Sequence, residues 1–254
     1  MRKLDYDRII SEVQEWIDDY CKSAKADGIV VGISGGIDSA VTSALCSKAI
    51  GKDAVLGLGL PCLSNPKDLS DAKLFAAQLG IEFITFDLTS VYEEIMKITA
   101  NNFESNNLAT ANLKARLRMA TWYFTAQSKG NYLIGGTGNR TELAIGYFTK
   151  YGDGGVDFEP IGGLYKCEVR KIAKKLNIPE EIINKSPSAG LWEGQTDEDE
   201  IGMTYDTMDE IIYRIDHNLS LNDLDKKDLE RVKDRMNMSK HKNNMPPTFE
   251  IKQQ

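Results

Sequence analysis

The feature that most limits the fold is a short apolar run at residues 29–33 (IVVGI), which leads directly into Ser-Gly-Gly and then into a helical pattern over 38–50. A continuous run with this many branched side chains predicts a strand buried on both faces, as in parallel sheets. Similar runs at 54–60, 81–86 and 132–134 alternate with helical patterns. This alternation predicts an α/β fold: a doubly wound, open parallel sheet with helices on both faces.

Helical periodicity accounts for much of the remaining chain. Apolar residues recur at helical spacing before the first strand and again in the long interval between the third and fourth strands. The ranges that we expect to be helical are 9–20, 38–50, 67–79, 91–99, 109–127, 166–175, 205–216 and 224–235. No internal repeat or low-complexity linker divides the chain, so we expect a single domain over residues 1–254.

One expected helix has aromatic residues outside its apolar face. The pattern over 109–127 gives a stripe formed by Leu113, Leu117, Ala120 and Phe124. Trp122 and Tyr123 lie off that stripe, so this pair either packs on a second subunit or packs elsewhere within the chain. The sequence leaves both possibilities open.

Composition and charge exclude several classes of protein. Hydrophobic residues make up 41% and charged residues 27% of the chain, as in ordinary globular proteins. No apolar run is long enough to span a bilayer, and the first residues lack the apolar core of a secretory signal. The net charge of −7 disfavours binding to nucleic acid or to an anionic membrane. The stretch over 190–213 has many acids and no lysine or arginine, and we interpret it as a solvated loop leading into a helix.

Cysteine usage points to a reducing compartment. The chain has four cysteines, and no two have the spacing of a zinc-ligand pair. We interpret them as reduced thiols in a cytoplasmic protein.

The segment GISGGIDSA at residues 32–40 predicts a phosphate-binding loop. Its glycines let backbone N–H groups approach a ligand closely, and the helix that follows adds unpaired donors and a partial positive charge. Ser34 and Ser39 can add hydroxyl donors. Asp38 beside a phosphate would be repelled unless a cation lay between them, so we infer that it binds Mg²⁺ carried by a nucleotide. The alternative is that Asp38 and Ser39 only cap the helix.

The spelling of this loop excludes two common phosphate-binding motifs. It is neither a Walker A loop, since no Gly-Lys-Ser/Thr follows, nor a GxGxxG fingerprint. SGGIDS instead resembles the pyrophosphatase loop of the ATP pyrophosphatase (PP-loop) superfamily. That resemblance implies the Rossmann-like fold known as adenine nucleotide alpha hydrolase-like, and enzymes that cleave ATP between its α and β phosphates.

Three further segments resemble one branch of that superfamily. The segments GTGNRTELAIGYFTKYGDGGVDFEPIGGLYK (136–166), NLKARLRM (112–119) and NMSKHKNNMPP near the C-terminus are similar to ammonia-dependent NAD synthetases. The resemblance implies two steps. The nicotinate carboxylate of deamido-NAD⁺ first attacks the α-phosphorus of ATP, giving an NAD-adenylate and pyrophosphate. Ammonia then attacks the activated carbonyl and releases AMP.

The resemblance also implies roles for individual residues. The ATP-binding residues would be Gly32, Ile33, Ser34, Gly35, Gly36, Ile37, Asp38, Ser39, Thr137, Lys166 and Ser188. The contacts to deamido-NAD⁺ would be Arg116, Lys150, Asp157, His241 and Lys242. Asp38 and Glu142 would bind Mg²⁺. Lys166 would neutralise phosphate charge, and Asp153 would steer ammonia toward the adenylate.

Each of these residues also has a plainer interpretation when taken alone. Arg116 and Lys150 would be surface charges, Glu142 a solvated helix residue and His241 part of a tail. Glu142 and Lys150 lie eight positions apart, so they would share a face if one helix continued through both, and the glycines after Tyr151 indicate that such a helix ends there. Only the coincidence of several motif positions favours the functional roles.

Two segments depart from the family pattern. Many members have an arginine and a glutamine after the second strand, whereas PCLSNPKDLSDAK offers Lys67 and Lys73, to which we assign no role. GTGNRTE also lacks the aspartate and histidine that follow Gly-Thr in one family variant, although Glu142 is retained.

Length and charge set the remaining expectations. Residues 1–31 leave no room for a glutaminase domain, so free ammonia is the expected nitrogen donor. Family members pair as homodimers through the helices before the fourth strand, and we expect the same here. The alternatives are a tRNA-modifying adenylating enzyme of the same superfamily and a nucleotide sensor without catalysis. The acidic charge disfavours the first, and the presence of both metal acids disfavours the second.

Overall fold

The fold is built on a four-stranded parallel sheet. The structure, a computed structural model, describes residues 2–188 and 196–250. The strands lie in the order β3-β2-β1-β4, and every neighbouring pair is parallel. They are β1 (Gly28–Gly32), β2 (Val55–Gly59), β3 (Glu82–Thr85) and β4 (Tyr132–Gly135). The chain runs outward from β1 to β3 and returns to the other side of β1 for β4, so the order reverses beside β1, where α/β sheets bind ligands.

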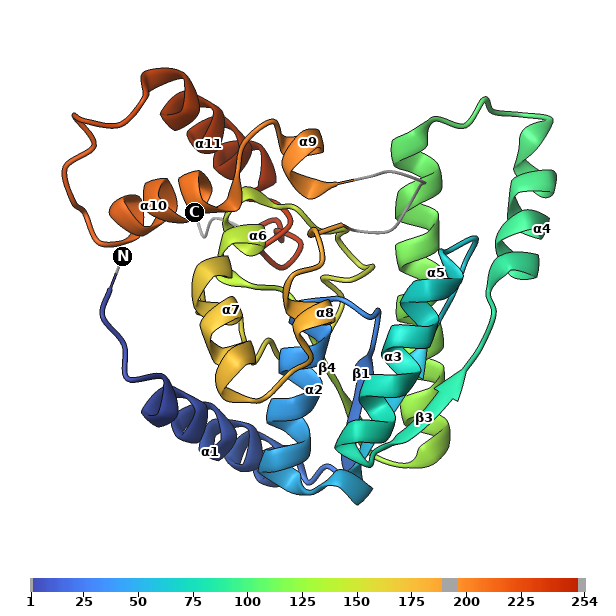
Figure 1. Cartoon of the computed structure of the whole chain (residues 1–254). Helices are drawn as coiled ribbons and strands as arrows, with labels where there is room; N and C mark the ends of the chain where they lie inside the picture. The colour runs from blue at the N-terminus through green and yellow to red at the C-terminus, as the bar shows by residue number, and fades with distance from the viewer. Residues whose placement is uncertain (1, 189–195, 251–254) are drawn as a thin grey trace.

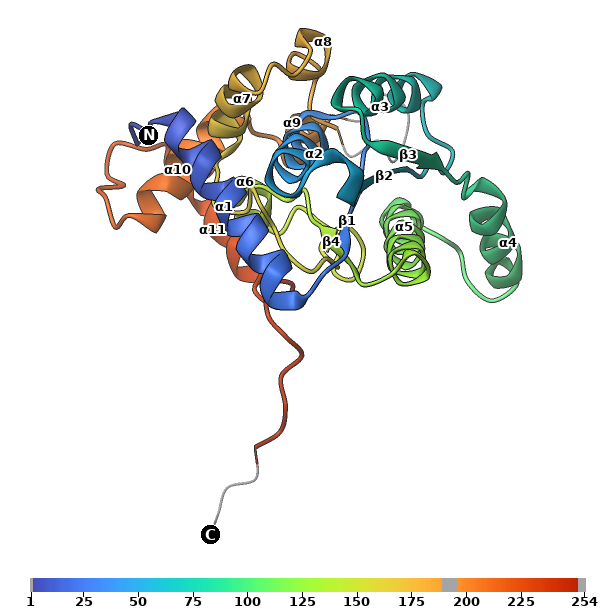
Figure 2. The same cartoon turned by 90° about the horizontal axis from the view of Figure 1, so that it is seen from below.

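Helices cover both faces of this sheet, which confirms the predicted fold class. Figure 2 shows α2 and α3 on one side of the strands and α5 on the other. The helices are α1 (Tyr6–Ala24), α2 (Ile37–Ile50), the 3-10 turn η1 (Lys52–Ala54), α3 (Pro66–Leu79), α4 (Thr89–Ala100), α5 (Asn107–Lys129), α6 (Arg140–Ile145), α7 (Lys166–Lys175), α8 (Glu180–Ile183), α9 (Asp197–Ile201), α10 (Tyr205–Asp216) and α11 (Lys226–Ser239).

Three apolar clusters hold these layers together. One packs α1, α2 and α7 on the side of the sheet that Val31 faces, and a second packs α4 and α5 on the side that Val30 faces. The third joins α6, α10 and α11 around Met208 and Tyr205. Figure 1 places α10 and α11 at the opposite side of the molecule from α4 and α5.

Most elements agree with the sequence predictions, and the short ones account for the differences. Helices α6, α8 and α9 were not expected, because they have too few residues to show a helical period. The helix that contains Glu142 ends at Ile145, since Gly146 has φ +67° and terminates it. The suggestion that Glu142 and Lys150 share a face of one helix is therefore wrong.

The aromatic pair of α5 faces inward. Trp122 packs on β1 so closely that a Cβ on Gly32 would lie 2.6 Å from its ring, and Tyr123 donates its hydroxyl to Asp157 (3.0 Å). Phe124, which we placed on the buried stripe, is 73% exposed. The buried face of α5 keeps Leu113 and Leu117 of the predicted stripe and includes the aromatic pair in place of Phe124, because the small Gly32 admits an indole ring that buries a large apolar area. The possibility that Trp122 and Tyr123 pack on a second subunit is not what the structure shows.

Two further observations limit the class of protein. Within residues 2–188 and 196–250, each helix is too short or too polar to cross a membrane. In the same ranges Cys21, Cys46, Cys62 and Cys167 are free thiols, and the first three are buried.

Candidate functional site

The loop after β1 is a tight turn held by two serines. Gly35 has φ +80°, and a Cβ there would lie 2.5 Å from the carbonyl oxygen of Asp68, so only glycine fits. Ser39 Oγ accepts the N–H of Ser34 (3.2 Å) and donates to the carbonyl of Gly36 (3.0 Å). Gly36 is the N-cap of α2 and forms no side-chain cap. The helix therefore begins at the loop without a side chain covering its first amides, the arrangement that suits an anion.

Three charged side chains meet beside this loop. Lys166 Nζ lies 2.5 Å from Asp38 Oδ2 and 3.1 Å from Glu142 Oε1. Asn139 donates its side-chain amide to the other oxygen of Asp38 (3.0 Å). Asp38 comes from α2, Glu142 from α6 and Lys166 from α7, so the fold joins residues that are up to 128 positions apart. Asp38 is thus turned toward this cluster, and the alternative that it caps α2 is wrong.

The electrostatics of the cluster favour an additional cation. Burial opposes the charge on Lys166, whose side chain is 2% exposed, but Asp38 and Glu142 outweigh that penalty and raise its pKa. Burial raises the pKa of Glu142 to about 7, Lys166 opposes this rise and the charge on Asp38 adds to it. One ammonium therefore faces two crowded carboxylates, which leaves net negative charge at this point.

Backbone contacts fix the helices that carry the cluster. Asn139 and Glu142 form a reciprocal capping box at the start of α6. The buried Asp209 accepts the N–H of Cys167 (2.8 Å) and the hydroxyl of Thr141 (2.5 Å). The Asp209 carboxylate accepts hydrogen bonds from amides at the N-terminus of α7 that have no partner within the helix. It therefore fixes the start of the helix that carries Lys166.

The acidic stretch is less solvated than the sequence suggested. Asp197 is 5% exposed, and it accepts the hydroxyls of Tyr205 (2.9 Å) and Tyr147 (3.1 Å). Tyr205 is fully buried, and its hydroxyl also lies 3.2 Å from Glu142. The interpretation as a solvated loop is wrong at Asp197, which begins α9 and is buried, whereas Tyr205 begins the helix expected there. An acid-rich composition hid this burial, since nothing in the local pattern distinguishes Asp197 from its exposed neighbours.

Four of the residues implied to bind deamido-NAD⁺ gather around the C-terminal segment. Lys150 Nζ donates to the carbonyls of His241 and Asn244, the latter at 3.2 Å. Arg116 reaches the carbonyl of Lys150 (3.4 Å). Lys242 donates to two carbonyls of the loop that follows α6, each at 2.7 Å. The segment is therefore fastened to that loop by lysine amines bound to main-chain oxygens.

The two aspartates from the glycine-rich segment lie apart from the charged cluster. Asp157 accepts the hydroxyl of Tyr123 (3.0 Å) and the N–H of Ile134 (2.7 Å), so both carboxylate oxygens have internal donors. Asp153 accepts the N–H of Thr149 (2.9 Å), in the turn before it. These contacts shape the loops on which the two residues lie.

The remaining predicted nucleotide contacts surround the loop. Thr137 is half-buried just after β4, and Ser188 is exposed and ends the first described range. Lys185, which the sequence analysis did not single out, pairs with Asp68 (2.5 Å) and lies 3.4 Å from the carbonyl of Gly35. Lys67, which had no assigned role, pairs with Asp71 (3.0 Å) along α3.

Comparison with known proteins identifies the family. Residues 9–246 match the profile described as NAD synthase. This chain belongs to the NAD synthase family. The resemblance drawn from the sequence motifs is thereby confirmed.

Similar proteins cover nearly the whole chain. An NH(3)-dependent NAD(+) synthetase of Methanosarcina acetivorans is 43% identical, with 98% of this chain and 100% of the relative covered. Among solved structures, the NMN synthetase from Francisella tularensis is 36% identical with TM-score 0.89 and covers 98% of this chain and 100% of its own. The NH3-dependent NAD synthetase from Campylobacter jejuni, in complex with the nitrate ion, is 32% identical with TM-score 0.84 and the same shares covered.

Proposed function

We propose that this protein is an ammonia-dependent NAD synthetase, a ligase that amidates deamido-NAD⁺ at the expense of ATP. The observation that supports this most directly is the cluster of Asp38, Glu142 and Lys166 beside the glycine-rich loop. Membership of the NAD synthase family supplies the reaction class, and the cluster supplies the groups that an adenylating enzyme needs.

The loop and the cluster would hold the ATP phosphates. The first amides of α2 would bind the phosphates, and the hydroxyls of Ser34 and Ser39 would add donors. Thr137 and Ser188 lie on neighbouring loops from which they would reach the phosphates. Lys166 would neutralise charge on the leaving pyrophosphate.

The carboxylates of Asp38 and Glu142 fit Mg²⁺. Hard cations prefer carboxylate oxygens together with substrate phosphates, and two acids that share one ammonium have charge to spare for such an ion. Bound with the nucleotide, Mg²⁺ would neutralise triphosphate charge. The protein's own contribution is to hold both acids at one edge of the sheet, with Asn139 orienting Asp38.

The second substrate would lie toward the C-terminal segment. Arg116, Lys150, His241 and Lys242 gather there, although the amines of Lys150 and Lys242 already bind main-chain carbonyls. Those two lysines would therefore act partly by holding the segment that contacts deamido-NAD⁺. The internal bonds of Asp157 favour the same indirect role for it.

The chemistry proposed has two steps. The nicotinate carboxylate is a poor electrophile, so its oxygen attacks the α-phosphorus and pyrophosphate leaves. Ammonia then adds to the acyl-adenylate, loses a proton and expels AMP. Asp153 would steer ammonia toward that carbonyl. Two anions must be brought together in the first step, so catalysis would depend mainly on positioning and charge neutralisation.

Mass spectrometry of the products tests the proposal. Purified protein with ATP, deamido-NAD⁺ and ammonium should form NAD⁺, AMP and pyrophosphate in equal amounts. AMP formation that does not need deamido-NAD⁺, or a requirement for glutamine as nitrogen donor, would contradict it. A gel shift with bulk tRNA tests the tRNA-modifying alternative.

A second acceptor belongs in the same assay. The TM-score of 0.89 to an NMN synthetase favours a test of the deamido form of nicotinamide mononucleotide. A higher kcat/KM for the mononucleotide than for deamido-NAD⁺ would reassign the substrate without changing the reaction class.

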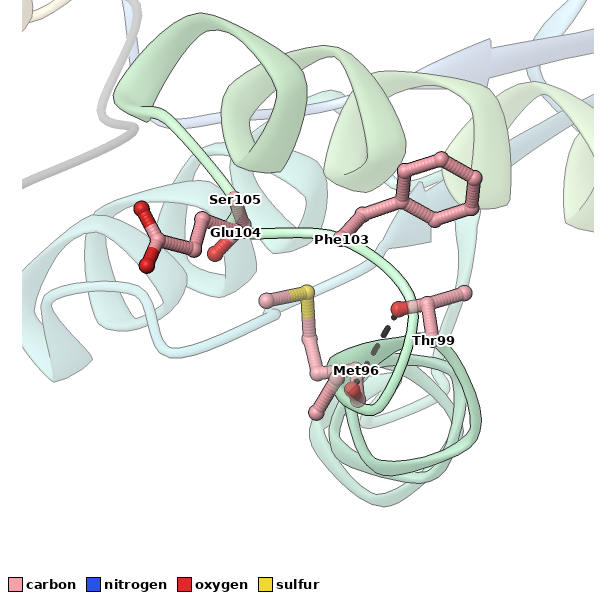
Figure 3. A pocket seen from close by; sticks show the side chains of 6 residues that line it. Met96, Thr99, Phe103, Glu104 and Ser105 are labelled. Carbon is pink, nitrogen blue, oxygen red and sulfur yellow. Dashed lines mark hydrogen bonds between the residues drawn. The ribbon is translucent and has the colours of Figure 1, made fainter.

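We also propose that the protein forms a homodimer through α4 and α5. These helices and their connection expose apolar side chains, among them Phe103 (75%), Leu108 (68%) and Ile98 (66%). Figure 3 shows the pocket of about 440 Å³ that opens here, lined by Met96, Thr99, Ala100, Phe103, Glu104 and Ser105. Large apolar side chains exposed together in this segment favour an interaction surface. A monomer in analytical ultracentrifugation at micromolar concentration would contradict the dimer.

We also propose that the chain forms a single domain and that the protein is cytoplasmic. Two of the apolar clusters pack on the sheet, and α7 joins the third to the first through Cys167, Val169 and Ile172, which supports a single domain over residues 1–254. The four free thiols support a cytoplasmic location, where cysteines stay reduced.

A further inference from the structure

A buried tyrosine contacts two of the three charged side chains in the cluster, Glu142 and Lys166, and has no part in the reaction described so far. Tyr205 is the first residue of α10 and is fully buried. Its hydroxyl lies 3.2 Å from Glu142 Oε1, and Lys166 Nζ lies 4.8 Å from the centroid of its ring. One side chain thus meets the carboxylate through its hydroxyl and the ammonium through its ring face.

A buried aspartate holds that tyrosine in place. Asp197 Oδ2 accepts the Tyr205 hydroxyl at 2.9 Å, closer than Glu142 does, and Asp197 Oδ1 accepts the hydroxyl of Tyr147 at 3.1 Å. The backbone N–H of Asp197 donates to the carbonyl of Pro187 (3.0 Å), the residue before Ser188. Asp197 therefore joins the segment that carries Ser188 to the tyrosine that contacts Glu142.

Asp197 and Glu142 share the single phenolic proton of Tyr205. A tyrosine hydroxyl donates one hydrogen bond, and here two carboxylates lie within reach of it. Glu142 is meanwhile fixed at its other oxygen by the N–H of Asn139 (3.3 Å). Lys166 Nζ holds Glu142 Oε1 at 3.1 Å, so this ammonium and the Tyr205 hydroxyl (3.2 Å) together fix the rotation of the carboxylate about its anchored oxygen.

We propose that Tyr205 and Asp197 are positioning residues that set Glu142 in the orientation that binds the nucleotide's divalent cation. Tyr205 acts directly on Glu142, and Asp197 acts through the hydroxyl of Tyr205. The inference rests on the proposed function only in taking Glu142 as a metal ligand.

The substitution Tyr205→Phe isolates the hydroxyl, because the ring that fills the cavity and faces Lys166 is retained. The probe is Mn²⁺, titrated by electron paramagnetic resonance in the presence of the α,β-methylene analogue of ATP, which is not cleaved. We expect the dissociation constant of Mn²⁺ to rise about tenfold, or about 1.4 kcal/mol. In kinetics the Mg²⁺ activation constant should rise while the KM for deamido-NAD⁺ stays within twofold.

The matched control is Tyr213→Phe, which removes a phenolic hydroxyl from the same helix. Tyr213 packs edge-on against Tyr165, with ring centroids 5.9 Å apart, and does not contact Glu142 in the described residues. Its Mn²⁺ affinity should equal that of the wild type.

A second variant tests whether Asp197 acts through Tyr205. Asp197→Asn keeps the shape of the side chain and removes the charge that holds the hydroxyl, so Mn²⁺ affinity should fall about threefold. The double variant should be no weaker than Tyr205→Phe alone, since both changes remove the same constraint.

The outcomes separate this inference from the proposed function. Unchanged Mn²⁺ affinity in folded Tyr205→Phe, or multiplicative losses in the double variant, would overturn the inference. If Tyr205→Phe does not fold, unchanged Mn²⁺ affinity in Asp197→Asn overturns it instead. A wild type that binds Mn²⁺ with the ATP analogue but forms no AMP from deamido-NAD⁺ would overturn the function alone.

Discussion

The two ends of the candidate site are built in different ways. Around Lys166, buried side chains from α2, α6, α7 and α10 pair with one another, and the positions are fixed before any ligand binds. Around Lys150, an exposed segment is fastened by lysine amines to main-chain carbonyls. Elsewhere, the α4–α5 surface leaves apolar side chains in solvent. The first end is preorganised for charge neutralisation, and the second is an exposed segment held by bonds to the main chain.

The comparison predicts that the largest loss of activity comes from the preorganised end. Asp38→Asn should slow adenylation about a thousandfold, or about 4 kcal/mol, because the loop keeps its shape but loses half of the carboxylate pair. Release of AMP dependent on deamido-NAD⁺ measures this.

Asp53→Asn is the matched control for that change, since Asp53 is exposed in η1 (Lys52–Ala54), near the start of β2 and away from the loop. Near-normal turnover in Asp38→Asn would remove Asp38 from the cation site.

Loss of the ammonium at the same end of the site should also lower the stability of the protein. Lys166→Met keeps the packing of the side chain but leaves two half-buried carboxylates without their ammonium, which should lower the free energy of unfolding by about 3 kcal/mol. Urea denaturation measures the loss. Lys174→Met on the exposed face of the same helix should change stability by less than about 0.5 kcal/mol. Equal stability of the two variants would show that the cluster is not tightly coupled.

A charge on the exposed α4–α5 surface should weaken dimerisation without unfolding the protein. Phe103→Asp places a charge in the apolar pocket of Figure 3 and should weaken dimerisation by about 2 kcal/mol, the size of a central contact. Sedimentation across a dilution series measures the shift. Leu74→Asp, at an exposed apolar side chain on α3, should leave the dimer unchanged. Equal weakening by both variants would place the interface elsewhere.

The smallest effect is expected at Lys150, whose amine binds main-chain carbonyls of the C-terminal segment. Lys150→Met should raise the KM for deamido-NAD⁺ about fivefold, close to 1 kcal/mol, with the KM for ATP unchanged, because only the C-terminal segment is released. Lys240→Met, at the end of α11, is the control. A parallel rise in the KM for ATP would mean that the two ends are not separate.

The strands and long helices were easier to predict from the sequence than the side-chain contacts between distant segments. The four strands and the full extents of α7 and α10 follow from patterns, and the motifs drew attention to Asp38, Glu142 and Lys166 but not to their direct pairing. The roles of Asp197 and Tyr205 do not follow from patterns or motifs, because they depend on burial and on contacts made across distant segments. The aromatic part of the buried face of α5 was missed for a related reason: the helical period is clear, but the room that Gly32 leaves for an indole ring lies on another strand.

That indole ring gives the protein an optical reporter. The ring of Trp122 packs on Gly32, the first residue of the phosphate loop. Its indole N–H is buried and has no hydrogen-bond partner within the described residues. Any movement of the loop around a nucleotide would change the surroundings of the ring. With Trp16 and Trp192 replaced by phenylalanine, the fluorescence of the remaining tryptophan would follow occupancy of the loop without an added dye.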